Sequence, residues 1–568
     1  MEIEIFLASS LEKVFPQRRP AAQPSGQTLS TWRGTRAAVQ LVYTVKNTQG
    51  LLVPQFSLEV SGGPVQPSVR SVELLPSEMP CYEKTDDNYL CTEPGLYPDL
   101  LQPVKEAVLR PVPGQYRAAW LTWDIPEDAK PGSYDIAITA RGMKEWQTPL
   151  ATLQKNPDAD SQVFTNQLTL CVRKAQLPPQ KLLHTEWFHA DCLASYYHVQ
   201  PLSEEHWAIL DKFIGSAAEH GINMLLTPVF TPSLDTAVGH ERPTVQLVDV
   251  VRENGQYRFG FEKLERWTGL CKKHGISHLE IAHFFTQWGA RATPKILAQT
   301  EKGTERIFGW DVPATSPEYR KFLESFIPAL RQELMRLGFD KDHVWFHISD
   351  EPSPENIDSY HAAHRQVDDL LTDCRVIDAL ADIQFYREGL VRTPIPSVNH
   401  IQPFLDEKIE GLWSYYCCGQ NYKVPNRFFA MPSARNRIMG TLWYLHNIAG
   451  FLQWGFNFYY RQYSLGLINP YQVTDAGRAF PSGDAFLVYP GENGEPLSSI
   501  RAEVQDDALL DLRALQLLDS LAGREETVKL IEELAGMKNL NFDEYPKDAD
   551  FLLSLRERVA EEIDRRLA

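Results

Sequence analysis

The chain of 568 residues lacks the features that would place it in a membrane or on nucleic acid. No apolar stretch approaches the roughly 20 residues that cross a bilayer. The N-terminus alternates like a β-strand and has no basic segment followed by an apolar one, so we expect no signal peptide and a cytoplasmic location. The alternative is that the protein is exported through a signal peptide that has been removed from this sequence. No block of Lys and Arg offsets the formal net charge of −18, which argues against a nucleic-acid partner.

Cysteine is also scarce, with eight residues spread along the chain without metal-like or disulfide-framework spacing. The neighbours Cys417 and Cys418 suit neither a zinc knuckle nor an ordinary disulfide, and we interpret them as buried small apolar side chains. Cys81 and Cys91 could be bridged in an exported protein. We expect a reduced protein without a structural metal or a cofactor.

What the chain does contain is typical of a globular, multidomain protein, with 43% hydrophobic and 23% charged residues. Residues 1–176 carry short alternating runs separated by Gly, Pro, Asn and Ser turns, which predict a β-sandwich domain. Residues 496–568 carry apolar residues at helical spacing, which predict a helical C-terminal segment that packs on the rest.

Residues 181–495 alternate strand-like and helix-like segments, the sign of parallel βα units. The predicted strands are residues 182–188, 223–228, 278–284, 344–349, 375–379, 398–401, 412–416 and 450–458. The predicted helices are residues 204–219, 261–274, 316–337, 353–371 and 434–447. Eight strands predict a (β/α)8 barrel of the TIM type. A doubly wound open sheet is the alternative, although no Gly-rich turn follows the first strand.

Polar and aromatic residues follow most of the predicted barrel strands, where barrels place their active sites. A purely structural barrel does not need this collection, whereas a pocket that stacks and hydrogen-bonds a sugar does. Histidines are frequent among them, but no His-x-His pair follows the first strand, so we predict no metal site. The predicted substrate-binding residues are His184, Trp187, His189, His283, Trp288, His347, Asn399, Tyr415, Tyr416, Tyr422, Trp454 and Asn457.

The most informative motif is HISDEP at residues 347–352, which places Asp350 and Glu351 where a buried strand becomes a loop. Pro352 is expected to bias Glu351 toward extended backbone. Acidic residues that decorate a helix N-terminus would give the same short pattern.

Two adjacent carboxyl groups do not fit the common arrangement of glycosidases. Those enzymes place two carboxyl groups on opposite sides of the scissile bond, roughly 5–5.5 Å or 6.5–9.5 Å apart. Neighbouring strand residues point to opposite faces, and the predicted seventh strand offers no partner acid, since Glu410 lies at its wrong end. An adjacent pair suits substrate assistance instead, in which a 2-acetamido group of the substrate is the nucleophile.

Four ordered motifs resemble the β-N-acetylgalactosaminidases of glycoside hydrolase family 123 and their wider barrel relatives. They are HISDEP at 347–352, LWSYYCCG at 412–419, GFLQWGFN at 450–457 and GDAFLVYPG at 483–491. The resemblance implies a sandwich-plus-barrel layout and a retaining hydrolysis of β-linked N-acetylgalactosamine, or a related N-acetylhexosamine, through an oxazolinium intermediate.

Carried over by position, the resemblance implies that Asp350 polarises the acetamido group and that Glu351 is the general acid/base. Tyr415 would donate to the acetamido oxygen, and Trp454 would be a sugar platform. A two-carboxylate glycosidase for sugars without a 2-acetamido group and a non-catalytic carbohydrate-binding barrel stay as alternatives. The expected partner is an oligosaccharide or glycoconjugate, with no membrane, and a homo-oligomer stays open.

Overall fold

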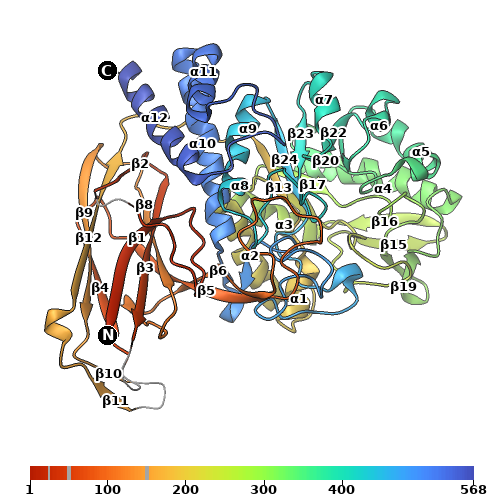
Figure 1. Ribbon diagram of the computed structural model, residues 1–568. Helices are drawn as coiled ribbons and strands as arrows, with labels where there is room; N and C mark the ends of the chain where they lie inside the picture. Colours follow the sequence, from red (N-terminus) through yellow and green to blue (C-terminus); the bar gives the residue numbers. More distant parts are fainter. Residues whose placement is uncertain (24–25, 48–52, 148–151, 568) are drawn as a thin grey trace.

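The computed structural model describes residues 1–23, 26–47, 53–147 and 152–567. A β-sandwich lies at one end, an eight-stranded parallel barrel forms the larger body, and three helices lie over the junction between them (Figure 1). This arrangement confirms the predicted fold class. The predicted segments also include residues 24–25, 48–52, 148–151 and 568, which lie outside the described residues.

The sandwich consists of two five-stranded sheets. In spatial order the first contains β1 (Glu2–Ser9), β3 (Arg36–Lys46), β8 (Arg117–Asp124), β5 (Ser68–Ser77) and β6 (Gly95–Pro103). The second contains β2 (Thr28–Thr31), β12 (Val163–Val172), β9 (Gly132–Gly142), β4 (Phe56–Ser61) and β7 (Val108–Leu109). A small hairpin, β10 (Glu145–Gln147) and β11 (Leu153–Lys155), extends from the same domain. Alternate residues such as Leu41, Leu121 and Ile138 are buried in one core, as expected for packed sheets.

The barrel strands run parallel, in chain order around the sheet. They are β13 (Leu183–Glu186), β14 (Met224–Thr227), β17 (His278–Ile281), β20 (Val344–Phe346), β21 (Arg375–Leu380), β22 (Thr393–Pro396), β23 (Trp413–Tyr415) and β24 (Gly450–Gln453). β24 pairs with β13, and a bridge between Ser397 and Tyr415 joins β22 to β23, so the sheet comes close to full closure. Most strand residues are buried, because a barrel sheet is covered on both faces.

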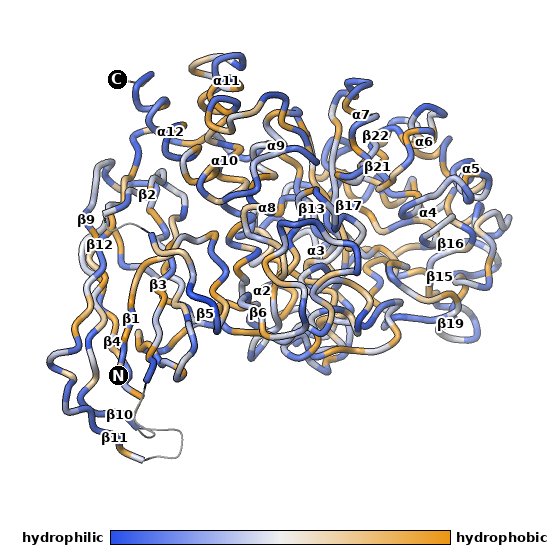
Figure 2. Tube along the Cα trace, in the orientation of Figure 1, coloured by the Kyte–Doolittle hydropathy of each residue, from blue (hydrophilic) through white to orange (hydrophobic). Residues whose placement is uncertain are grey.

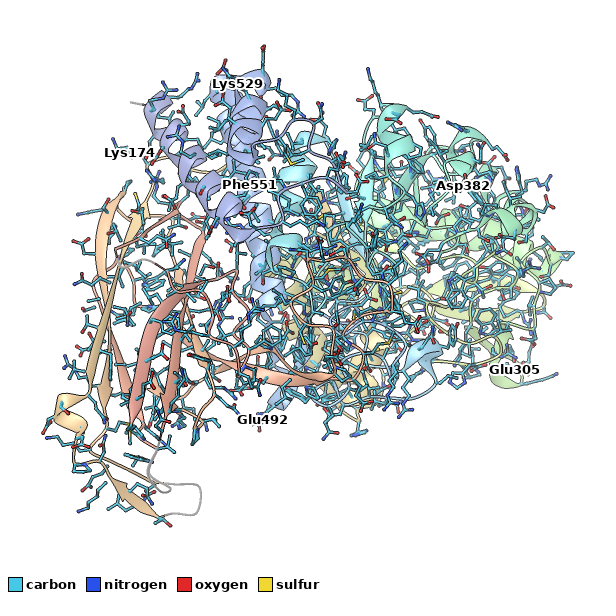
Figure 3. All side chains as sticks on the ribbon, viewed as in Figure 1. Lys174, Glu305, Asp382, Glu492, Lys529 and Phe551 are labelled. Atoms are coloured by element: carbon cyan, nitrogen blue, oxygen red, sulfur yellow. The ribbon has the colours of Figure 1, made fainter. Side chains whose placement is uncertain are left out.

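Helices and one extra sheet surround the barrel. The helices are α1 (Ala190–Tyr196), α2 (Glu204–Glu219), α3 (Glu262–Lys273), α4 (Pro317–Arg336), α5 (Ile357–His364), α6 (Gln384–Arg387), α7 (Gln402–Asp406), α8 (Ala434–Arg437) and α9 (Met439–Leu445). The extra sheet has the order β16 (Gln256–Gly260), β15 (Asp249–Glu253), β18 (Ile296–Thr300) and β19 (Gly303–Phe308). Its strands come from the two long loops that follow β14 and β17. Glu305 on β19, labelled in Figure 3, lies at the end of the molecule far from the sandwich.

The sixth strand is the one barrel strand that the sequence misplaced. The prediction put it at residues 398–401, whereas the structure forms β22 from Thr393–Pro396. Pro394 and Pro396 lack the backbone N–H of a central strand, which argues against a strand at this position in sequence. In the barrel, all four residues of β22 are in parallel register with β21, and this pairing decides the assignment.

Two predicted helices are broken in the structure. The segment predicted at 353–371 contains a 3₁₀ turn (Pro354–Asn356), α5 and a second 3₁₀ turn (Asp368–Leu370). The segment predicted at 434–447 forms α8 and α9, separated only by Ile438. Helical spacing of apolar residues therefore located these segments but not their internal breaks.

The C-terminal segment forms α10 (Ile500–Ala522), α11 (Arg524–Ala535) and α12 (Ala549–Leu567) after the short strands β25 (Tyr489–Pro490) and β26 (Pro496–Leu497). Both hydrophobic and hydrophilic colours occur along these helices in Figure 2, as expected for amphipathic helices that pack on one face. Phe551 of α12 belongs to the buried face. Within the described residues, no helix combines the length and the apolar character needed to cross a membrane.

Buried ion pairs connect the sandwich to the barrel and to the helices. Asp99 of β6 pairs with Arg501 of α10 at 2.8 Å, and both side chains are almost fully buried. The loop between β5 and β6 reaches the barrel, where Asp86 accepts two hydrogen bonds from Arg435 of α8 at 2.9 Å. These contacts hold the sandwich against the barrel.

Candidate active site

A pocket of about 240 Å³ opens at the carboxyl ends of the barrel strands. This is the end at which barrel enzymes place their chemistry. Its lining comes from loops that follow six strands and from the ends of the strands themselves. The lining residues are Trp187, Leu234, Asp235, Gln287, Trp288, Asp350, Glu351, Ala379, Tyr415, Cys417, Cys418, Leu452, Trp454, Gln462 and Phe480.

Asp350 and Glu351 are half-buried in this pocket, immediately beyond β20. The backbone carbonyl of Asp350 accepts a hydrogen bond from the Trp288 amide at 3.1 Å, which ties the pair to the loop after β17. Glu351 has a φ of +41°, so the prediction of extended backbone is wrong. Pro352 disfavours the right-handed helical region, and Glu351 takes a left-handed φ instead. Such backbone strain in a non-glycine residue is concentrated at functional sites.

Glu351 has two partners that come from β23 and its following loop. The Tyr415 hydroxyl donates to Glu351 Oε1 at 2.7 Å, and the Cys417 thiol lies 3.9 Å from the same oxygen. By contrast, no described residue donates a hydrogen bond to the Asp350 carboxylate. Asp350 therefore offers an unoccupied acceptor to the pocket.

The two carboxyl groups titrate together. Burial raises the pKa of Asp350 well above its usual value, and the negative charge of Glu351 raises it further. Burial also raises the pKa of Glu351, and the hydrogen bonds from Tyr415 and Cys417 oppose this shift. Because two adjacent buried carboxyl groups resist double ionisation, the pair retains one proton well above the usual range for carboxylic acids.

A third carboxyl group, Asp235, lines the pocket from the loop after β14. Its Oδ2 accepts a hydrogen bond from the Tyr463 amide at 2.9 Å. Burial raises the pKa of Asp235 to about 6. No sequence motif marks this residue, because it lies eight positions beyond the end of β14 in a long loop.

A buried chain of hydrogen bonds lies below the carboxyl pair. His347 contacts Glu280 Oε1 of β17 at 2.6 Å through Nε2 and Asp378 Oδ1 of β21 at 3.1 Å through Nδ1. Burial by itself lowers the pKa of His347, but the two carboxylates outweigh it and raise the pKa to about 9. Glu280 also accepts from the indole N–H of Trp187 at 2.7 Å. His347 is thus a buried cation that holds pocket residues in place.

Trp454 forms another wall of the pocket and is fixed by Asp484. Its indole N–H donates to Asp484 Oδ2 at 2.9 Å. Burial raises the pKa of Asp484 to about 7, although the Trp454 hydrogen bond opposes the shift. The motifs at 450–457 and 483–491 therefore meet at one side of the pocket.

The pocket lining includes Trp187, Trp288, Tyr415 and Trp454 of the predicted substrate-binding residues, together with Asp350 and Glu351. The other predicted residues lie elsewhere, and for His184 and Tyr416 the reason is that side chains alternate along a strand and its immediate extension. His184 contacts Gln505 of α10 at 2.9 Å, and Tyr416 donates to Asn436 of α8 at 3.1 Å, so both face away from the barrel interior.

Six further predicted residues do not line the pocket. His189 contacts the Trp454 carbonyl at 2.8 Å, and Asn457 accepts from the His189 amide at 2.8 Å. Asn399 accepts from Gln420 at 2.9 Å, and the ring of Tyr422 lies under Lys84. His347 is buried as described, and His283 stacks on it with ring centroids 4.1 Å apart.

The sequence missed several lining residues. Cys417 and Cys418 are half-buried in the pocket wall, so their interpretation as buried apolar side chains is wrong. Their position directly after a strand end was the available signal. Gln287, Gln462 and Phe480 come from long loops whose course cannot be read from local spacing. Cys81 and Cys91 are separate thiols.

The described residues contain no group of three or more His, Cys, Asp or Glu side chains arranged to hold a metal ion. The pocket chemistry that is present consists of carboxyl groups, a phenol, thiols, amides and aromatic rings. Such a set can donate and accept protons and hydrogen-bond a polar ring.

Comparison with known proteins agrees with this geometry. The model of the glycoside hydrolase 123 catalytic domain matches residues 187–518. The barrel with its carboxyl-lined pocket is therefore that of a glycosidase. The chain belongs to glycoside hydrolase family 123.

Solved structures give a second comparison. A family 123 glycoside hydrolase from Clostridium perfringens is similar with a TM-score of 0.72 and 16% identity, over 99% of this chain and 98% of that one. A β-glucuronidase from Ruminococcus gnavus has a TM-score of 0.30 and 10% identity, over 89% and 97% of the two chains. The first match shows a shared fold. No curated protein matches the chain.

Proposed function

We propose that this glycosidase removes β-linked N-acetylgalactosamine, or a related N-acetylhexosamine, from a glycan by a retaining, substrate-assisted mechanism. The observation that carries the proposal is the adjacency of Asp350 and Glu351 at the end of one strand, inside one pocket. Substrate-assisted glycosidases are exceptions to the rule of two opposed carboxyl groups.

In the first step, the acetamido oxygen of the bound sugar attacks the anomeric carbon. The glycosidic bond breaks as Glu351 gives its proton to the leaving oxygen, and an oxazolinium ion forms. Asp350 accepts a hydrogen bond from the acetamido N–H and stabilises the positive charge that develops there. In the second step, Glu351 takes a proton from water, the water oxygen attacks the anomeric carbon, and the acetamido group is restored with retained configuration.

The titration of the carboxyl pair supports this division of labour. The mechanism needs one protonated and one ionised carboxyl group, and a coupled buried pair holds one proton. The larger upward pKa shift falls on Asp350. A substrate N–H directed at Asp350 favours its ionised form and leaves the proton on Glu351, because hydrogen bonds to a carboxylate lower its pKa.

The remaining lining residues fit a sugar. Trp187 and Trp454 provide apolar faces with polar edges, the usual surface for a pyranose. Tyr415 ends β23 and donates to Glu351, and we assign it the donor role toward the acetamido oxygen once substrate displaces it from Glu351. The structural relative from Clostridium perfringens is described in connection with glycolipid glycan hydrolysis, which supports a glycoconjugate substrate.

One observation favours a second candidate function. Asp235 lines the same pocket, so an ordinary two-carboxylate glycosidase with Asp235 as nucleophile and Glu351 as acid/base is the alternative. Such an enzyme would need no 2-acetamido group on its substrate.

A panel of aryl β-glycosides of GalNAc, GlcNAc, Gal and Glc distinguishes the two functions. Activity on the two N-acetylhexosaminides, with inhibition by a GalNAc-thiazoline that mimics the oxazolinium ion, is the expected result. Activity confined to Gal and Glc, with Asp235 labelled by a 2-fluorosugar, would overturn the proposal. NMR of the first-formed anomer tests retention.

A further inference from the structure

Two aromatic side chains are exposed at the mouth of the pocket. Trp288, in the loop after β17, is 40% exposed, and Tyr463, in the loop after β24, is 37% exposed. Their ring centroids lie 5.6 Å apart at an interplanar angle of 84°. Large aromatic residues are usually buried, so a neighbouring exposed pair beside a carboxyl-lined pocket indicates binding.

The backbone holds both rings in this place at a conformational cost. Trp288 has a φ of +55° and Tyr463 a φ of +59°, a region that bulky residues rarely adopt. Each amide is bonded to a pocket carboxyl residue, Trp288 to the Asp350 carbonyl and Tyr463 to Asp235 Oδ2. Strained residues persist where the surrounding contacts fix them, and here those contacts come from the site itself.

The polar edges of the two rings are free for a ligand. Across the described residues, neither the Trp288 indole N–H nor the Tyr463 hydroxyl has a hydrogen-bond partner. Val238, in the excursion after β14 whose Ala237 amide donates to the Tyr463 carbonyl at 3.0 Å, is 81% exposed, so the surface beside the rings is also apolar. An apolar face with unpaired donors at its edge matches a pyranose ring.

The size and lining of the pocket place Tyr463 outside the first sugar site, since Trp288 lines the pocket and Tyr463 does not. Its volume of about 240 Å³ lies below the roughly 300–1,000 Å³ of pockets for drug-sized ligands. A pocket of this size accommodates one sugar residue, and the next unit of the chain must leave through the mouth. Trp288 lines the pocket, its ring contacts Tyr463 and its amide donates to the Asp350 carbonyl, so the pair of rings is adjacent to the carboxyl pair.

We infer that Trp288 and Tyr463 form a leaving-group subsite that stacks the sugar ring on the other side of the scissile bond. The inference rests on the proposed function and adds a specificity determinant, Tyr463, to it. The ligand class is a β-linked hexopyranose leaving group that presents an apolar face, rather than an alkyl or other non-cyclic group.

The test compares two substrates that differ only in the leaving group. One is a disaccharide with GalNAc β-linked to a hexose, and the other is N-acetyl-β-galactosaminyl fluoride, which places no ring in the leaving-group subsite. We expect Tyr463→Ala to lower kcat/KM for the disaccharide roughly tenfold and to leave fluoride hydrolysis unchanged. Tyr463→Phe keeps the ring and should stay within about twofold of the wild type on both. Leu465→Ala, a change in the same loop without loss of a ring, is the matched control.

Equal losses on both substrates in Tyr463→Ala, or an equal disaccharide loss in Leu465→Ala, would overturn the subsite. The wild type provides a test without any variant, since kcat/KM for the disaccharide should exceed that for methyl β-GalNAc at least tenfold; equal values would also overturn it. Failure of the wild type to hydrolyse the fluoride and aryl β-GalNAc contradicts the proposed function instead.

Discussion

The hydroxyl of Tyr415 donates a 2.7 Å hydrogen bond to Oε1 of Glu351 across the mouth of the barrel. Tyr415 ends β23 and Glu351 follows β20, two strands that are not neighbours in the sheet. The bond therefore depends on closure of the barrel. It stabilises the ionised form of Glu351 and opposes the effect of burial on the pKa of that residue.

Tyr415→Phe should raise the pKa of Glu351, because it removes a donor to the carboxylate. A general acid with a higher pKa stays protonated at higher pH, so the basic limb of the kcat/KM profile should move upward. The lost donor toward the acetamido group should also lower kcat by roughly 10²-fold. A pH profile on aryl β-GalNAc measures both effects, and a basic limb at lower pH would contradict the assignment.

Glu351→Gln removes the proton donor, and the resulting loss of kcat should depend on the leaving group of the substrate. With a poor leaving group, kcat should fall by roughly 10²–10⁴-fold. With an activated leaving group such as dinitrophenolate, the first step needs little protonation and should retain far more activity. A Brønsted plot for a series of aryl β-GalNAc substrates measures this, and equal losses across the series would rule out the acid role.

Asp350→Asn should slow formation of the oxazolinium ion whatever the leaving group, because the acetamido N–H loses its anionic acceptor. A loss of roughly 10²–10³-fold in kcat on both activated and poor substrates is expected. Asp235→Asn is the comparison variant in the same pocket. A larger loss with Asp235→Asn, together with a normal first step in Asp350→Asn, would support the two-carboxylate alternative.

His347 should make stability depend on pH. Its pKa rises from 6.5 to about 9 in the folded protein, so the protonated form is favoured by folding. The stabilisation is fully present below pH 6.5 and is lost as the pH rises through about 9, a change of roughly 3 kcal/mol. Thermal unfolding between pH 6 and pH 10 should show this decline. His347→Gln should flatten it, and an unchanged slope in that variant would contradict the buried cation.

The Asp99–Arg501 pair should contribute strongly to the junction between the sandwich and the helices. Arg501→Met leaves a buried carboxylate without its partner and should destabilise the protein by about 3–5 kcal/mol. The double variant Asp99→Leu/Arg501→Met should recover part of this loss. Recovery is partial because Arg501 also donates to the carbonyls of Gly483 and Phe486. Urea unfolding of the single and double variants measures the coupling, and strictly additive losses would contradict it.

Much of the fold follows from local sequence patterns. Buried runs such as Val344–Phe346 and amphipathic segments such as Glu204–Glu219 located strands and helices directly. The sixth strand could not be located this way, because its two prolines argue against a strand and only pairing with β21 offsets this. The four-stranded sheet beside the barrel joins two separate excursions, and local spacing does not encode such pairing.

In the site too, local sequence patterns predicted some residues and only the tertiary structure placed others. The HISDEP motif identified Asp350 and Glu351, since polar residues after a buried strand stand out in sequence. Position near a strand end was not sufficient to predict that a residue lines the pocket. The side chains of His184 and Tyr416 point to the outer face and contact α10 and α8. Asp235 was missed because its loop reaches the pocket only after a long excursion.

The sequence by itself determined the order of the domains, most strands and helices, and the carboxyl pair, because these depend on residue type and short-range spacing. The tertiary structure decided which residues share the pocket. Barrel closure brings Tyr415 to Glu351, alternation along each strand selects inward side chains, and long loops deliver Asp235 and Tyr463 to the mouth. These are contacts between residues far apart in the chain, and they exist only once the barrel has formed.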